Sequence, residues 1–317
     1  MRSGSPWSRV LLALAVVGSL VACEERRQPV AGPPVSTPTP EAREPSPTTS
    51  GSGSPAITSG PPPAPAPKAR IPTDPKRLAE RLTRNHRAVM RAADAWRKRS
   101  EGGRPLSLEA LYQQRIYRLL GREPDLARAV IRRLPGAIER FARSNVAAVR
   151  ALLSLVVPIE PPIRLRPTRP ARPLRLMRFY REGEAQTGIP WELLASVNFV
   201  ETRFGRVMGP STAGAVGPMQ FLPSTWEQYG GGGDIMDPRD SILAAARYLS
   251  VSGAPSDTRA ALFAYNRSYA YVDAIELYAR EMMRDERAFH AYYFWQVFVT
   301  TTKGDVQLTG PGSRGSR

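Results

Sequence analysis

The chain has 317 residues, 32 prolines and a formal net charge of +17. Its length allows two domains, although the prolines are concentrated before residue 75 and leave less chain for a folded core. The single cysteine, Cys23, excludes an intramolecular disulfide and a zinc site built from several thiolates.

The first 22 residues have the pattern of a secretory signal peptide. Two arginines precede an apolar run from Val10 to Val21, which is too short to span a bilayer as a helix. The run leads into the tetrapeptide Leu20–Cys23, which resembles a bacterial lipobox. The resemblance implies that Cys23 is acylated and becomes the mature N-terminus; the alternative is an ordinary signal peptide with an incidental cysteine. We therefore expect an exported, membrane-anchored lipoprotein on the outer membrane, facing the periplasm.

Residues 23–73 are rich in Pro, Ser, Thr and Gly and have almost no large apolar side chains. A segment of this composition cannot bury enough surface to offset the entropy that ordering costs. The composition therefore predicts a disordered, partly polyproline tether. Fully extended, such a tether would reach on the order of 150 Å from its lipid anchor.

A basic helical segment is predicted for residues 74–158. Its first helix is marked by apolar side chains at helical spacing, which are Leu78, Leu82, Val89 and Trp96. Later helices are expected at 107–120, 124–134 and 136–156. In residues 74–173, 23 Lys and Arg stand against 9 Asp and Glu, so this part carries +14 of the total charge. That charge favours anionic envelope polymers over nucleic acid in an exported chain, and a solvated arginine-rich face is the alternative.

A proline-rich stretch, residues 159–173, has too many prolines for a helix. It is expected to be a stiff connector, or a strap lying along the next domain. Residues 174–302 then predict an all-α domain large enough for one core, followed by a disordered tail at 303–317. Its helices are expected at 174–187, 190–204, 223–229, 239–251, 257–265, 269–284 and 286–298.

One carboxylate, Glu201, stands out in this domain. Pro190 suits the first turn of its helix, and Gly205 suits the residue just past the end. Glu201 falls on the apolar stripe of the helix, near the negative end of the helix dipole. Both loss of water and the dipole raise a carboxyl pKa, as a general acid working near neutral pH requires. The alternative is a glutamate at the rim of the stripe that reaches solvent or pairs with Arg203 or Arg206.

Four motifs occur in an order that resembles the lytic transglycosylases. They are Glu201–Gly205, Gly214–Trp226, Asp237-Pro238 and Ala264–Asn266. The resemblance covers roughly residues 175–285 and is closest to the membrane-bound B type and its relatives. It implies a lysozyme-like helical fold, peptidoglycan glycan strands as the binding partner, and Glu201 as the catalytic residue.

The resemblance also implies a set of substrate-binding side chains. Gln220, on a loop that glycines make tight, can donate and accept hydrogen bonds toward a sugar. Tyr265 and Asn266 end an apolar helix and would face the cleft, where capping the helix is the alternative. Tyr248 matches a cleft tyrosine by its spacing, although it could instead pack between helices. The remaining members of the set are Ser211 and Tyr271.

No metal or other cofactor is expected, because the stretch from Gly230 to Asp237 lacks the twelve-residue ligand series of the calcium loops in some B-type relatives. In the mechanism that the resemblance implies, Glu201 protonates the glycosidic oxygen of a MurNAc–GlcNAc linkage while the 2-acetamido group assists at C1. The ionised Glu201 then removes the C6 hydroxyl proton, and that hydroxyl attacks C1 to give a 1,6-anhydro product. A hydrolytic muramidase and a catalytically weak peptidoglycan-binding lipoprotein are the alternatives.

Overall fold

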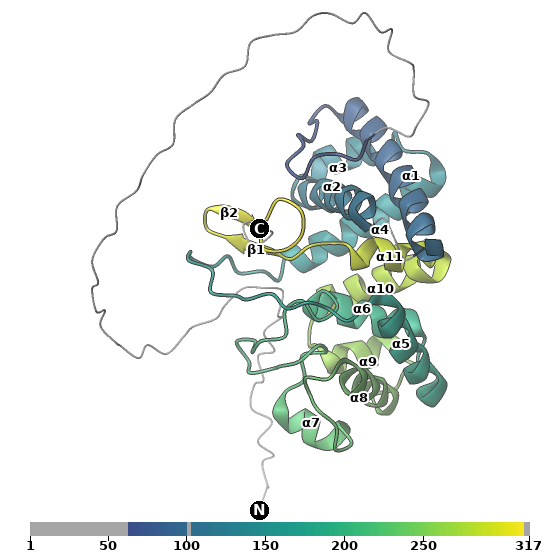
Figure 1. Cartoon of the computed structure of the whole chain (residues 1–317), viewed down its shortest axis with the longest axis vertical. Helices are drawn as coiled ribbons and strands as arrows, with labels where there is room; N and C mark the ends of the chain where they lie inside the picture. Colours follow the sequence, from purple (N-terminus) through teal and green to yellow (C-terminus); the bar gives the residue numbers. More distant parts are fainter. Residues whose placement is uncertain (1–62, 100–102, 314–317) are drawn as a thin grey trace, which may run out of the picture. The chain divides into compact units, whose positions relative to one another are not determined.

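A computed structural model describes residues 63–99 and 103–313. Three predicted features lie outside these residues: the signal peptide, the expected lipidation site Cys23 and most of the tether. Within them the chain is predominantly helical, which confirms the predicted fold class (Figure 1). In this described part, no helix is long and apolar enough to cross a membrane.

The basic segment forms helices close to the predicted ones. They are α1 (Pro75–Arg99), α2 (Gly103–Arg122), α3 (Pro124–Ile131) and α4 (Gly136–Leu153). The stripe on α1 is buried as expected, since Leu78, Leu82 and Val89 are fully shielded from solvent. The Lys and Arg side chains of α1 from Lys76 to Lys98 lie on its exposed face.

The C-terminal part contributes the remaining helices. They are α5 (Pro173–Thr187), α6 (Trp191–Thr202), α7 (Pro223–Tyr229), α8 (Pro238–Val251), α9 (Thr258–Tyr265), α10 (Tyr269–Arg284) and α11 (Arg287–Tyr293). Several begin at side chains that accept backbone hydrogen bonds, the usual way to satisfy the free N–H groups of a first turn. Asp237 caps α8 in this way, Asp257 caps α9 and Ser268 caps α10.

The two helical parts share one hydrophobic core. Helix α4 packs on α10, and α1 packs on α11 (Figure 1). Buried residues of both parts, such as Phe141 of α4 and Tyr292 of α11, belong to a single cluster in which their rings stack at 6.3 Å. The basic segment is therefore an extension of the C-terminal core and not a separate globule.

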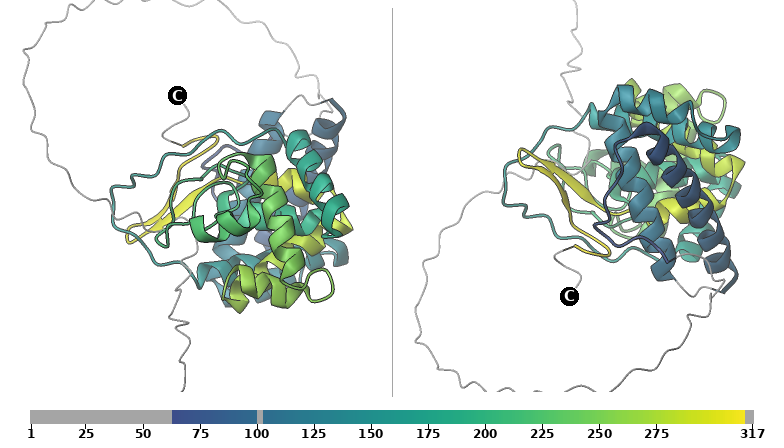
Figure 2. Two further views of the ribbon diagram at one scale, coloured as in Figure 1. Left: turned by 90° about the horizontal axis from the view of Figure 1, so that it is seen from below. Right: turned by 90° about the horizontal axis from the view of Figure 1, so that it is seen from above.

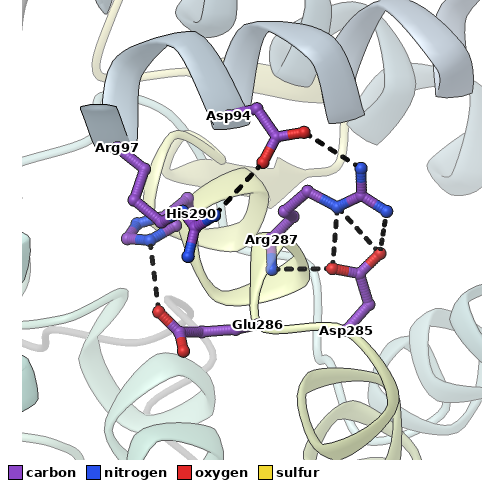
Figure 3. A network of polar contacts seen from close by, with 6 residues as sticks. All are labelled: Asp94, Arg97, Asp285, Glu286, Arg287 and His290. Carbon is purple, nitrogen blue, oxygen red and sulfur yellow. Dashed lines mark hydrogen bonds and ion pairs between the residues drawn. The ribbon is translucent and has the colours of Figure 1, made fainter. Parts of the chain in front are cut away.

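Charged side chains also join α1 to the start of α11 (Figure 3). Arg287 binds Asp285 at 2.7 Å within its own turn and Asp94 of α1 at 3.1 Å. His290 lies 3.9 Å from Glu286, but burial lowers the pKa of the imidazole to about 4. The imidazole is therefore neutral near pH 7, and Arg287 supplies the charged contact between the two helices.

The end of the chain departs from the prediction. Helix α11 stops at Tyr293 and is followed by an antiparallel hairpin, β1 (Phe298–Thr301) and β2 (Gly304–Gln307). The helix expected at 286–298 therefore exists but ends five residues early, and the expected disorder is wrong for residues 303–313. The run of Val and Thr before the turn favours an extended strand, and Gly304 takes the positive φ of 102° that the turn needs.

The proline-rich connector is a strap. Ile159 donates its N–H to Thr300 O at 3.2 Å and accepts from Thr302 N at 3.1 Å, beside the hairpin (Figure 2). Further along, Thr168 N donates to Arg206 O at 2.8 Å. The strap thus runs from the hairpin to the residues that follow α6.

The last residues of the predicted tether are also ordered. Arg115 of α2 donates to the carbonyl oxygens of Pro67 and Ala69, at 3.0 and 2.9 Å. Tyr112 donates to Arg70 O at 3.1 Å. The prediction of disorder up to residue 73 is wrong for these residues. Side chains of α2 donate hydrogen bonds to their backbone carbonyl oxygens, which a proline-rich segment with few N–H groups cannot satisfy by itself.

Candidate active site

Glu201 lies in the last turn of α6. This helix is buried on all sides, because every residue from Trp191 to Thr202 except Glu192 is buried. The sequence analysis expected one apolar stripe, whereas almost the whole circumference of α6 is buried. α6 is therefore a central helix of the core. Only 7% of Glu201 remains exposed.

Helix α6 ends earlier and more tightly than expected. Arg203 and Phe204 adopt left-handed conformations with φ of 53° and 62°, and Gly205 follows with φ of 86°. A side chain in this region strains the backbone, so other contacts must hold it there. Gly205 donates its N–H to Thr202 Oγ1 at 2.8 Å and accepts from Thr168 Oγ1 at 2.6 Å. The strap therefore helps to hold the turn that follows Glu201.

Burial controls the acidity of Glu201. Loss of water raises the pKa of the carboxyl to about 7, and a hydrogen bond from Tyr271 partly opposes that rise. The Tyr271 hydroxyl donates to Glu201 Oε1 at 2.7 Å. Neither Arg203 nor Arg206 pairs with the carboxyl in the described structure, since both guanidinium groups stack on aromatic rings. The alternative of a surface ion pair is wrong.

The loop that contains Gly214 and Gly217 is hydrogen-bonded directly to α6. Asn198 Nδ2 donates to Pro218 O at 2.8 Å, and Thr202 Oγ1 donates to the same oxygen at 2.6 Å. Gly217 has φ of 79°, and a Cβ added to it would lie 2.1 Å from Ile235 O. One turn of α6 thus positions both the carboxyl and the loop beside it.

A pocket opens next to Glu201 and encloses about 570 Å³, counting space open to solvent. It is lined by Glu201, Ala213, Ala215, Gln220, Phe221, Leu222, Thr225, Tyr248, Ala264, Tyr265 and Asn266. The structure therefore brings together Glu201 and four of the expected substrate-binding side chains. The small lining residues were missed, because alanine and threonine in a loop carry no distinctive sequence signal.

Two expected residues lie outside this lining. Tyr271 is fully buried and reaches Glu201 from α10, so it contacts the carboxyl but not the pocket. Ser211 accepts N–H bonds from Ala213 and Ala215 at 3.3 and 3.0 Å. The structure thus gives Ser211 a part in shaping the loop, where contact with substrate had been expected.

Two tyrosines in the pocket lining, Tyr248 and Tyr265, are held in place by hydrogen bonds from their hydroxyl groups. Tyr265 donates to Met219 O at 2.6 Å, and Tyr248 donates to Ala264 O at 2.9 Å. The two rings meet edge to face, with centroids 5.5 Å apart. With both hydroxyl groups occupied, the rings offer the pocket apolar surface.

Two amide side chains keep unused hydrogen-bonding capacity. Gln220 donates through Nε2 to Gly217 O at 3.1 Å, while its Oε1 is buried and has no partner in the described structure. Asn266 is 3% exposed, and its side chain makes no hydrogen bond to any described residue. Both amides line the pocket, where a ligand could satisfy them.

Glu201 is the one carboxyl group among the residues that line this pocket in the described structure. Asp237, the other acidic residue in the four sequence motifs, accepts from the N–H groups of Arg239 and Asp240 and so caps α8. Among residues 63–99 and 103–313, no group of three or more His, Cys, Asp or Glu side chains could hold a metal ion.

Comparison with known proteins shows what the part of the chain around this site resembles. Residues 178–282 match the profile of the Transglycosylase SLT domain. The chain is 31% identical over 157 residues to a membrane-bound lytic murein transglycosylase F of Thiobacillus denitrificans, covering 47% of this chain and 32% of that protein. It is 29% identical over 113 residues to the protein of the same name from Methylobacillus flagellatus, covering 33% of this chain and 24% of that protein.

Both relatives are named as the F type, where the motifs had suggested the B type. The chain spans about a third or less of the length of these curated relatives. No solved structure matches it. The matched segment contains Glu201, Tyr271 and the whole lining of the pocket, so the candidate site lies within the part of the chain that resembles a transglycosylase SLT domain.

Proposed function

We propose that this protein is a peptidoglycan lytic transglycosylase that cleaves the MurNAc–GlcNAc β-1,4 linkage without water. The main support is a single buried carboxyl group, that of Glu201, whose pKa is raised to about 7. It lies beside a pocket in which no other described lining residue has a carboxyl group. Most glycosidases need two carboxyl groups, one of them a nucleophile or a base for water. One is enough when the substrate supplies the nucleophile, and the SLT match supports that chemistry.

In the proposed reaction, Glu201 is first a general acid. Its protonated carboxyl gives a proton to the glycosidic oxygen, and the bond from that oxygen to C1 of MurNAc breaks. The hydrogen bond from Tyr271 occupies Oε1, which leaves Oε2 to carry the transferred proton. The MurNAc 2-acetamido oxygen stabilises C1 while the leaving sugar departs.

Glu201 is then a general base. Its ionised carboxylate removes the proton from the C6 hydroxyl of the same MurNAc, and the C6 oxygen forms the new bond to C1. The 1,6-anhydro ring closes, the acetamido oxygen is released and Glu201 is protonated again. A pKa near 7 suits both steps, because the acid and its conjugate base are similarly accessible at neutral pH.

We assign sugar binding to the groups that the pocket leaves available. The Gln220 Oε1 and the Asn266 amide supply hydrogen bonds to hydroxyl or acetamido groups. The rings of Tyr248 and Tyr265 supply an apolar surface for a sugar face. Ser211 and Tyr271 support this site without lining it.

The function is tested by identifying the product. Purified sacculi are digested in heavy-oxygen water, and the released fragments are weighed by mass spectrometry. A lytic transglycosylase gives 1,6-anhydroMurNAc ends that contain no solvent oxygen. Reducing MurNAc ends that carry the heavy oxygen would instead identify a muramidase, and absence of any release would favour a binding lipoprotein.

Substitution of Tyr271 by Phe is expected to shift the pH profile upward. The Tyr271 bond stabilises the ionised carboxyl, so its loss raises the pKa of Glu201 above about 7. Because free Glu201 must be protonated to act first as an acid, kcat/KM falls as pH rises through that pKa. The fall in the variant therefore occurs at higher pH than in the wild type.

The matched control is Tyr269→Phe, on the same helix but 63% exposed. It should leave the profile unchanged. A Tyr271→Phe profile that stays in place or moves to lower pH would contradict the assigned role of this hydroxyl.

We also propose that the exposed arginines of α1 bind anionic envelope polymers. Arg84 and Arg91 lie two turns apart on one exposed face and form no ion pair with any described residue. The double variant Arg84→Gln/Arg91→Gln should bind immobilised alginate, a carboxylated polysaccharide, more weakly at low salt. The difference should shrink as salt screens these exposed charges. The control Arg178→Gln/Arg280→Gln removes the same amount of charge from other exposed positions. An equal loss of binding in the control would mean that net charge alone causes the effect, and would contradict a specific role for α1.

Membrane attachment through Cys23 is a further proposal. The names of both relatives include "membrane-bound", which supports an envelope location for this chain. Wild-type protein should fractionate with membranes, most of it with the outer membrane, and carry acyl mass on an N-terminus at Cys23. Cys23→Ser should lose that mass and leave the membrane fraction; a variant that stays there would count against the anchor.

A further inference from the structure

A second pocket lies between α4, α10 and the β1–β2 hairpin. It encloses about 370 Å³, counting space open to solvent. It is lined by Arg118, Val149, Leu152, Leu153, Val156, Arg203, Tyr278, Phe298 and Thr300. None of these residues lines the pocket beside Glu201, so the proposed glycan site does not account for it.

The positive charges of this pocket are incompletely neutralised. Arg118 binds Asp305 at 2.7 Å, but the same carboxylate also binds Arg122 at 2.8 Å. Arg203 forms no ion pair with any described carboxylate and donates only to Phe199 O at 2.7 Å. Burial lowers the pKa of Arg203 to about 10, which still leaves it charged at neutral pH. The lining thus has two guanidinium groups and no carboxylate.

A buried hydroxyl in the same lining also lacks a partner. Tyr278 is 1% exposed, and its hydroxyl makes no hydrogen bond within the described structure. Buried polar groups in proteins are nearly always satisfied, so an unpartnered hydroxyl on a residue that lines a pocket points to an occupant. Thr300 adds a hydroxyl that lies 3.4 Å from Arg118 Nη2.

The other walls of the pocket are apolar and come mainly from the last turns of α4 and from β1. They consist of Val149, Leu152, Leu153, Val156 and Phe298. A phosphate or sulfate would place charged oxygens against this carbon surface. A small anion with an alkyl group would instead cover it.

We infer that this second pocket binds a small organic carboxylate. Its two oxygens accept from the guanidinium groups of Arg118 and Arg203 and from the Tyr278 hydroxyl, and its alkyl group packs on the end of α4. Charged hydrogen bonds of this kind are the strong ones, and guanidinium groups suit the planar carboxylate. Arg203 ends α6 two residues after Glu201, so the occupant contacts the helix end that holds the carboxyl of the first pocket.

Calorimetric titration of the whole protein with butyrate tests the inference. At constant ionic strength, butyrate should bind saturably, whereas butyramide, which has the same shape without the charge, should not. Tyr278→Phe removes a hydroxyl that has no partner to lose, so the fold should tolerate it. Loss of one hydrogen bond to a charged ligand should weaken butyrate binding by about tenfold or more.

Tyr117→Phe is the matched control, because the Tyr117 hydroxyl is also buried and unpartnered but does not line the pocket. It should bind butyrate like the wild type, while Arg203→Gln should abolish binding. Equal affinity of Tyr278→Phe and Tyr117→Phe would overturn the inference. So would the absence of saturable binding to the wild type, or binding of inorganic phosphate in preference to butyrate.

Discussion

Glu201→Gln is expected to lower the release of 1,6-anhydromuropeptides from purified sacculi by at least about 10²–10⁴-fold. Glutamine keeps the shape of the side chain and an oxygen that accepts from the Tyr271 hydroxyl. It cannot give a proton to the glycosidic oxygen or take one from the C6 hydroxyl. Because one residue is proposed for both steps, and no second carboxyl lines the described pocket, nothing nearby replaces it.

Two controls separate this loss from a loss of fold. Asp237→Asn keeps a side-chain oxygen that can cap α8, because asparagine and aspartate cap helices about equally well, and should retain most activity. Glu201→Gln should itself be at least as stable as the wild type near pH 7. The folded carboxyl has a pKa of about 7 against an ordinary value of 4.5, so its burial destabilises the wild type increasingly as pH rises between those values. Near wild-type product release by Glu201→Gln would refute the proposed mechanism.

Phe199→Ala is expected to lower the free energy of unfolding by about 3–5 kcal/mol. Phe199 is fully buried in α6, two residues before Glu201. Its ring lies 4.9 Å from that of Tyr278 on α10 and 5.2 Å from that of Tyr292 on α11. The truncation would leave a cavity where these helices meet, and rigid aromatic neighbours cannot close over it.

Urea unfolding, followed by circular dichroism, measures this effect. Val251→Ala is the control: it also removes apolar carbon, but from a side chain that is 67% exposed at the end of α8. It should change the midpoint only slightly. If Phe199→Ala unfolded at nearly the same urea concentration as this control, the aromatic cluster would not be the centre of the core.

Helical spacing and turn residues predicted most of the helices, because these signals act over a few neighbouring residues. The end of α6 did not follow from them. Gly205 was the obvious residue for a left-handed turn, yet Arg203 and Phe204 take that conformation as well. Contacts from Thr168, far away in the sequence, help to hold them, and no local pattern encodes such a contact.

The change in charge near residue 173 illustrates a second limit. It separates a basic stretch from a balanced one, and this contrast suggested two structural parts. Charge reports what lies on the surface, however, and says little about which apolar side chains meet inside. Here α4 and α10 pack together beneath the change in surface charge. The pocket was anticipated only where a residue had distinctive chemistry, as with Glu201 and Gln220.

The aromatic cluster around Phe199 also limits how this protein can be cut for the laboratory. The segment that matches the SLT profile ends at residue 282, before Tyr292 and Trp295, whose rings lie 5.2 and 5.7 Å from that of Phe199. A recombinant fragment of residues 178–282 would therefore expose a tyrosine- and phenylalanine-rich surface to water and tend to aggregate. Expression and crystallisation should start from residues 63–313, and a chimaera that contains residues 178–282 must also include the helices that cover them.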